Sequence, residues 1–424
     1  MARDLDTLVE LIGRDVSPVM AQGVPSRAVV VGTFRRLVEE PHQVAQAVIG
    51  HPAYREGAEA VRADVDLARI ITVGAIGPML IAANGAPRVS AGGVIAEAFG
   101  SAAAELRCRG VAPSAEALTA MALRNVDRMR LIGRDSPTEV ATFLGFSSIS
   151  LAESQELDLP WGQLAAPVGF YGMAEFMPTA RPTSAVLVAD HRLSIEIDAT
   201  SSGLGPEVPQ PIVDHNEWIQ LTMRLVSLAV LLGTPRARVA PIATFQHTLL
   251  PYETPISAYH QLVLAPPPVE RRLDADECLE IERWAQILDQ RYSTRLEVGS
   301  RRVIAALSQR IDPSDRLIDA VTAWESLFSA DQDASLRVTG SLAWLLKPNT
   351  TAEREALQQE LAGIYRLRSQ VVHGRAAEPI TVSAASLRAT EVAVLALAGL
   401  LKDRPELIPI DSVDRSRRLL LGLG

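Results

Sequence analysis

The strongest constraint on the fold is a helical pattern that fills the last third of the chain. It begins after the proline-rich segment 265–269, whose stiff, extended composition is typical of a linker. Seven helices are expected after it, near 274–290, 294–310, 313–330, 333–346, 352–373, 384–402 and 411–422. Asp312-Pro313 and Pro348-Asn349-Thr350 mark two of the starts with residues that helix N-termini favour. Short connections between the helices predict a bundle.

The first 135 residues are rich in Ala and Val and have helical periodicity. Helices are expected near 8–19, 52–67 and 114–129. The uncharged run 70–87 is just long enough to suggest a membrane span. It contains several glycines and prolines, so a buried helix followed by a turn is the better prediction, and no membrane association is expected.

The pattern changes between residues 136 and 265. Short apolar runs predict strands near 185–189, 193–197, 240–245 and 261–264. One helix is expected over 216–232, with Asp214 or Asn216 as its cap. It would end at Gly233 and Pro235.

These patterns predict a multidomain α+β protein with three parts. They are an Ala-rich helical N-terminal region (1–135), a small β-rich or α+β middle region (136–265) and a C-terminal all-α helical bundle (270–424). Cys108 and Cys278 lie far apart and without motif partners, which argues against disulfides and a cysteine-based zinc site. With no signal-peptide pattern at the N-terminus, a cytoplasmic location is expected.

The charge balance limits how the chain could bind nucleic acid. The formal net charge is −9, so the overall field would repel it and any RNA site must be a local basic patch. Aromatic residues make up only 4% of the chain, which argues against a base-stacking platform for single strands.

A charged residue interrupts the apolar stripe of the helix expected over 352–373. Leu357, Leu361, Ile364, Arg368 and Val371 follow one another at steps of three and four. Arg368 therefore occupies a core-facing position, where a guanidinium must be paired, lie in an interface or face a ligand.

A second charge interrupts the stripe of the helix expected over 313–330. Ile318, Val321, Glu325 and Phe328 form this stripe, so Glu325 also replaces an apolar residue. Opposite charges in two core-facing stripes predict an ion pair between Glu325 and Arg368. Such a pair would either position the guanidinium for function or only fix the bundle.

Gly374 is expected to end the helix that carries Arg368, which places His373 in the last turn. The helix dipole favours an imidazolium there, and histidine titrates near neutral pH. Five residues correspond to a rotation of about 140°, so Arg368 and His373 do not share a face. They converge only if Arg368 reaches around the helix or if a second subunit completes the site.

The decapeptide from Tyr365 to Gly374, YRLRSQVVHG, resembles the signature of the HEPN superfamily, an arginine followed after four to six residues by a histidine. It is most similar to the ApeA-like branch, in which a tyrosine and Arg-Ser precede Val-His-Gly. The segment 315–328 resembles the first ApeA-like helix, with Glu325 as its characteristic acid. The resemblance covers the last third of the chain only.

The resemblance implies an HEPN-like helical bundle that pairs into a homodimer and cleaves RNA without metal or cofactor. His373 would act as base on a ribose 2′-hydroxyl or as acid toward the leaving 5′-oxygen. Arg368 would stabilise charge on the phosphate, and Ser369 would donate a hydrogen bond to it. The products would be 2′,3′-cyclic phosphates. The implied biology is bacterial anti-phage or stress defence, in which cleavage of cellular RNA halts growth (abortive infection).

Arg366 and Arg375 flank this motif and could form the basic patch that guides RNA, although each could also be a solvated surface residue.

Two other functions stay open. The bundle could be a catalytically silent module for dimerisation or partner binding. Alternatively, the region before 265 could be a separate enzyme or the sensor of an unknown trigger. The six other histidines lack the spacing of a metal site or triad, and Arg415, Arg417 and Arg418 are expected on a solvated helix end.

Overall fold

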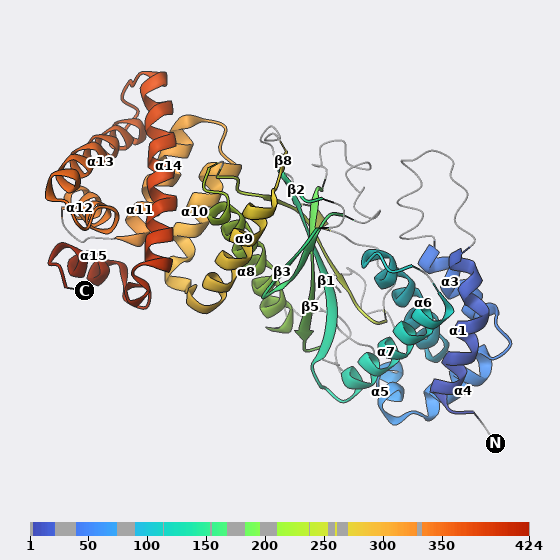
Figure 1. The fold of residues 1–424 in the computed structure, drawn as a ribbon. Coiled ribbons are helices and arrows are strands. Elements are labelled where there is room, and N and C mark those ends of the chain that lie inside the picture. Colours follow the sequence, from blue (N-terminus) through green and yellow to red (C-terminus); the bar gives the residue numbers. More distant parts are fainter. Residues whose placement is uncertain are drawn as a thin grey trace.

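The computed structural model describes residues 3–21, 40–73, 90–112, 114–152, 155–167, 183–195, 210–236, 238–252, 259–260, 270–328 and 333–423. Helices predominate among these residues, together with a small antiparallel sheet, which is an α+β layout. N-terminal helices lie at one end, a helical bundle lies at the other, and the sheet lies between them (Figure 1). The expected strand at 261–264, the proline-rich linker and most of the run 70–87 fall outside the described residues.

The described N-terminal helices are α1 (Leu5–Ala21), α3 (Glu40–Gly50), α4 (Tyr54–Ala63), α5 (Val65–Val73), α6 (Ala91–Cys108) and α7 (Ala115–Gly133). They share one hydrophobic core, in which α6 is buried along most of its length. The expectation of a single helix over 52–67 is wrong, because Asp64 separates α4 from α5. Its carboxylate accepts hydrogen bonds from the backbone N–H groups of Asp66 and Leu67, which begins a new helix.

The main sheet has six antiparallel strands in the order β3-β4-β5-β1-β6-β7. Its strands are β1 (Thr138–Ser147), β3 (Glu156–Leu159), β4 (Gly162–Ala165), β5 (Ala185–Leu193), β6 (Ile242–Leu249) and β7 (Tyr259–His260); β2 (Ile149–Ser150) and β8 (Arg271–Arg272) form a separate parallel pair. Side chains alternate between two buried faces along β1, because successive strand residues point to opposite sides. Leu144 and Phe146 join the core that continues into the bundle, whereas Ala141 and Phe143 pack with Cys108 of α6.

One long helix, α8 (Gln210–Gly233), follows β5 in the described part of the chain. It ends at Gly233 as expected, but Asp214 and Asn216 lie inside it, so the predicted cap is wrong. The helix packs against α9 of the bundle. Its buried residues Ile219, Val226 and Val230 belong to the same hydrophobic core as the bundle.

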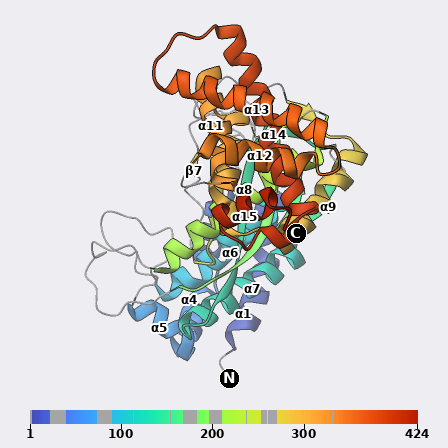
Figure 2. The ribbon, with the colours of Figure 1, turned by 90° about the vertical axis from the view of Figure 1, so that its left-hand side faces the viewer.

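The C-terminal helices lie close to the ranges that the sequence periodicity predicts. They are α9 (Ala275–Arg291), α10 (Glu297–Ser308), α11 (Pro313–Leu327), α12 (Ala334–Leu346), α13 (Thr351–Val372), α14 (Pro379–Lys402) and α15 (Ser412–Leu420), with short 3-10 helices η3 (Thr294–Leu296) and η4 (Pro405–Leu407). Asp312 caps α11 and Pro313 is its first residue, as predicted. Figure 2 shows this bundle from its far end, with α11, α12, α13 and α14 in front of the sheet.

The prediction that Arg415 lies on a solvated helix end is wrong. Arg417 and Arg418 are exposed, but Arg415 is completely buried. Its guanidinium donates hydrogen bonds to four backbone carbonyl oxygens, so it fastens α15 to the end of α11 and to the turn before α15.

Helix α14 is the one described helix long and apolar enough to cross a membrane. It packs against α11, α12 and α13, and 67% of its most apolar window is buried inside the protein. Its apolar composition is therefore accounted for by its place in the core of the bundle.

Candidate functional site

The candidate site lies where α11 packs against α13, and the predicted pairing of its two charges is present. Glu325 is in the last turn of α11, and Arg368 is near the end of α13. The Nη2 atom of Arg368 donates to Oε2 of Glu325 over 3.3 Å. The side chains are 23% exposed for Arg368 and 29% exposed for Glu325, so the pair lies at the edge of the core and water can reach it.

Tyr365 is a third member of this cluster. It lies three residues before Arg368, so both side chains leave the same side of α13. Its hydroxyl donates to Oε1 of Glu325 over 2.6 Å, so each carboxylate oxygen has one donor. Burial and this hydrogen bond raise the pKa of Tyr365 to about 12, which keeps the phenol protonated at neutral pH. The sequence motif includes this tyrosine, but its role is visible only from the structure.

The Nε atom of Arg368 is buried and has no hydrogen-bond partner among the described residues. A buried donor without an acceptor costs about 1–3 kcal/mol. This N–H is closed off from solvent, so any ligand would have to accept from the accessible part of the guanidinium, whose side chain is 23% exposed.

Helix α13 ends immediately after this cluster in a Schellman motif. Gly374 has a φ of +67°, and its N–H donates to the carbonyl oxygen of Val371, while the N–H of Arg375 donates to that of Gln370. Glycine adopts this left-handed conformation without steric cost, which is why the helix ends here. His373 is the C-cap residue, and its exposed ring has no hydrogen-bond partner among the described residues.

Within one chain, the structure does not bring Arg368 and His373 together. The guanidinium of Arg368 is directed to Glu325 on α11, whereas His373 caps α13 at the surface. No hydrogen bond or ion pair between described residues joins the two side chains. This agrees with the rotation of about 140° that five helical residues impose.

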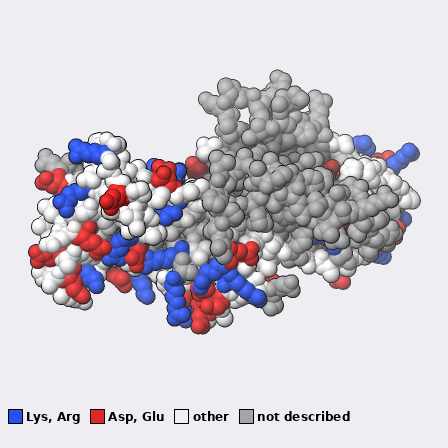
Figure 3. All heavy atoms as spheres, turned by 90° about the horizontal axis from the view of Figure 1, so that it is seen from above, with Lys and Arg blue, Asp and Glu red and all other residues white. Residues whose placement is uncertain are grey.

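The other predicted site residues surround this end of α13. Ser369 is half-buried, and its hydroxyl has no partner among the described residues. Arg366 and Arg375 are exposed, and neither guanidinium has an ionic partner in the described part of the chain. Figure 3 shows basic and acidic side chains intermixed over the described part of one face of the molecule.

A second polar cluster joins residues that are distant in the sequence. His191 of β5 stacks on Trp218 of α8, with ring centroids 3.9 Å apart, and the ring centroid of His215 lies 5.2 Å from that of His191. His215 is buried and hydrogen-bonded to the Thr248 hydroxyl over 2.9 Å. Burial and the neighbouring His191 lower the pKa of His215 to about 4. Asp190 is instead paired with Arg109, so the neighbours Asp190 and His191 form no dyad.

Metal coordination has no structural support within the described ranges. No group of three or more His, Cys, Asp or Glu side chains is placed there to hold a metal ion.

Comparisons with protein-family models, with curated proteins and with solved structures found no match for this chain. The geometry around Glu325, Tyr365 and Arg368 is therefore the main structural support for a function of the bundle.

Proposed function

We propose that this chain is a metal-independent endoribonuclease of HEPN type, of the ApeA-like branch, with residues 270–424 as its HEPN-like bundle. The supporting observation is an arginine that an acid of a neighbouring helix holds in place, one turn before a helix end that exposes a histidine. This arrangement places a fixed positive charge and a titratable group on one short segment. Both are needed to cleave a phosphodiester without a metal.

The proposed reaction uses the ribose as the nucleophile. His373 takes the proton of the 2′-hydroxyl, and the 2′-oxygen then attacks phosphorus. The bond to the 5′-oxygen breaks, that oxygen takes a proton from water, and a 2′,3′-cyclic phosphate remains. Arg368 stabilises the charge on the non-bridging oxygens, for which its planar fork is suited, and Ser369 donates to the same phosphate.

We propose that two chains form the complete site as a homodimer. The separation of Arg368 from His373 within one chain supports this, because a second α13 can supply the missing partner. Val372, Ile380 and Leu387 support it further, since they are exposed apolar residues near the turn between α13 and α14. Arg366 and Arg375 would guide the RNA backbone into this site.

The proposed setting is the bacterial cytoplasm, in anti-phage or stress defence. The region before residue 265 would then respond to a trigger and control the nuclease. The hydrophobic core that the sheet shares with the bundle supports such control, because a close-packed core transmits a displacement from one side to the other.

The test is RNA cleavage by the full chain in the presence of EDTA. Wild-type protein and His42→Ala, which removes a histidine exposed on α3, should cleave equally. His373→Ala and Arg368→Ala should each lose cleavage by about 100-fold or more. Equal cleavage by wild type and His373→Ala would refute the site. Absence of cleavage from every protein would favour the silent dimerisation or partner-binding module.

Mixing the two inactive variants tests the shared site. If Arg368 and His373 come from different subunits, a mixed dimer has one intact site, and random mixing restores about a quarter of wild-type activity. If both residues act within one chain, mixing restores nothing.

A further inference from the structure

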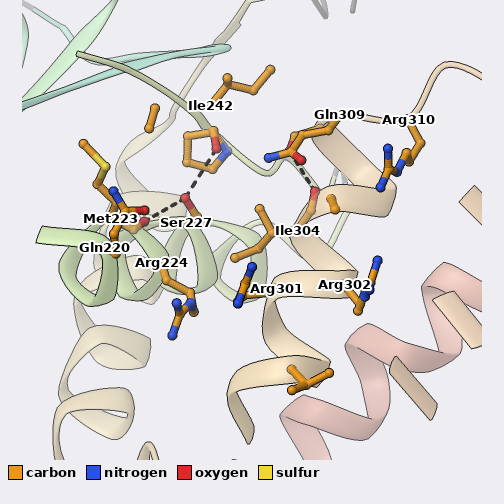
Figure 4. A pocket seen from close by; sticks show the side chains of 15 residues that line it. Gln220, Met223, Arg224, Ser227, Ile242, Arg301, Arg302, Ile304, Gln309 and Arg310 are labelled. Atoms are coloured by element: carbon orange, nitrogen blue, oxygen red, sulfur yellow. Dashed lines mark hydrogen bonds between the residues drawn. The ribbon is translucent and has the colours of Figure 1, made fainter. Parts of the chain in front are cut away.

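A pocket of about 470 Å³ lies between α8, the start of β6 and α10. This volume is within the range of small-molecule sites, about 300–1,000 Å³. Four of its lining residues are arginines: Arg224 from α8, Arg301 and Arg302 from α10, and Arg310 just after α10. No aspartate or glutamate is among the described residues that line the pocket. Figure 4 shows Arg301 between Arg224 on one side and Arg302 and Arg310 on the other.

The charges around this pocket do not cancel. Arg302 and Arg310 share one acceptor, Asp319 of α11, over 2.6 and 2.5 Å. Arg224 pairs with Glu297 over 3.0 Å. Among the described residues, these four guanidinium groups form ion pairs with two carboxylates only, with Asp315 as a further acidic neighbour of Arg310, so the lining is net positive in a chain whose formal net charge is −9.

The arginines also keep free hydrogen-bond donors. Arg302 uses Nη1 and Arg310 uses Nε toward Asp319, so each retains further N–H groups. Arg301 is exposed and has no hydrogen-bond or ionic partner among the described residues. Guanidinium forks of this kind match the geometry of phosphate oxygens.

The rest of the lining is aliphatic and small. Met223, Ile242 and Ile304 form an apolar part of the wall beside the arginines (Figure 4). The lining that the structure describes contains no aromatic side chain, so this part of the wall offers no platform for stacking the bases of a single strand.

We propose that this pocket binds a small phosphorylated organic molecule with at least two negative charges. Its phosphate lies on Arg301 and the neighbouring arginines, and its organic part lies against Met223 and Ile304. The finite volume and the aliphatic wall favour a small ligand over an RNA strand. This site is separate from the cluster at Glu325, and it does not depend on ribonuclease activity.

The test is calorimetric titration of the full chain with inorganic pyrophosphate, glucose 6-phosphate and ADP at low and high salt. Pyrophosphate is the minimal probe, and all its contacts are expected with the arginines. It should bind, and added salt should weaken binding. Arg301→Gln should weaken it by about 10- to 100-fold, the effect of losing one charged hydrogen bond. Glucose 6-phosphate and ADP distinguish a sugar phosphate from a nucleotide by which of them exceeds pyrophosphate in affinity.

Arg283→Gln is the matched control, because it removes an exposed arginine of α9 that does not line the pocket and lowers the net charge equally. It should leave binding unchanged. Arg301 holds no ion pair in the described structure, so its variant should fold normally. Failure of pyrophosphate to bind, or equal weakening by both variants, would overturn the proposal. Binding of a short RNA that requires Arg301, without pyrophosphate binding, would overturn it in favour of an RNA groove.

Discussion

Arg415 is a completely buried charge whose removal should cost the fold heavily. Its Nε donates to the carbonyl oxygen of Leu407 over 2.9 Å, and its Nη1 donates to that of Leu327 over 2.7 Å. Its Nη2 donates to the carbonyl oxygens of Ile408 and Ile410 over 3.2 and 2.9 Å. Burial lowers the pKa of this guanidinium to about 10, so the group remains charged at neutral pH.

Arg415→Met keeps most of the side-chain volume and removes all four donors. Leaving a buried carbonyl without its donor costs about 1–3 kcal/mol, and relaxation of the turn recovers part of the sum. We expect a loss of about 4–6 kcal/mol in the free energy of unfolding, a large share of the 5–15 kcal/mol typical of a domain. Arg417→Met is the control, since that side chain is 65% exposed and its loss should cost less than about 0.5 kcal/mol.

Urea unfolding followed by tryptophan fluorescence measures this difference. Trp324 is completely buried in α11, three residues before Leu327, whose carbonyl oxygen accepts from Arg415, so its change in emission reports on unfolding of the bundle. A lower urea midpoint with an unchanged slope is the expected result for Arg415→Met. If the two variants unfold within about 1 kcal/mol of each other, the assumption that these four hydrogen bonds are desolvated is wrong.

Three further outcomes are expected. Glu325→Gln offers one acceptor oxygen to Tyr365 and Arg368 instead of two. RNA cleavage should therefore fall about 10- to 100-fold, while the free energy of unfolding changes by less than about 1 kcal/mol. A loss of stability that matches the loss of activity would make the pair purely structural. Because the pKa of His215 is lowered from 6.5 to about 4, only the unfolded chain gains its proton in this range, and stability should fall by up to about 3 kcal/mol as the pH drops through it. His215→Gln should make that pH profile shallower but not flat, because burial also lowers the pKa of His247 to about 4; an unchanged profile in acid unfolding would exclude His215 as a cause. A Cβ at Gly133 would lie 2.2 Å from a backbone oxygen of α5, whereas one at Gly363 would meet nothing within 4 Å, so Gly133→Ala should lower the melting temperature and Gly363→Ala should raise it.

The sequence predicts the bundle well because its signals are local. The periodicity of α13 and α14, the cap at Asp312 and the stop at Gly374 each depend on neighbouring residues only. The pairing of Glu325 with Arg368 could be predicted for a related reason. Each charge interrupts an apolar stripe of its own helix. Because the two charges have opposite signs, an ion pair between them is the expected way to bury both.

The features that the sequence does not predict depend on long-range contacts. Strand β1 pairs with β5 and β6, whose residues lie some 40 to 110 positions away, so its register has no local signature. Arg415 resembles its exposed neighbours, because backbone carbonyls that accept from it leave no trace in the residue types around it. The pocket between α8 and α10 likewise takes its arginines from distant parts of the sequence, since Arg224 is on α8 and the other three are on α10 or just after it.

Three charged contacts along α11 differ in their access to water, and this difference bears on function. Asp319 is 3% exposed between two arginines, and the carbonyl of Leu327 is held by a completely buried guanidinium, so both contacts stabilise the position of the helix. The Glu325–Arg368 pair is about a quarter exposed on each side, and ion pairs in such settings contribute about 0–1 kcal/mol. Apolar residues at these two stripe positions would stabilise the bundle at least as well. Stability alone therefore gives little reason for an arginine with a buried, unsatisfied Nε at this position. A substrate that accepts from the solvent-accessible N–H groups of this guanidinium would account for an arginine at this position, which supports the proposed catalytic role over a purely structural bridge.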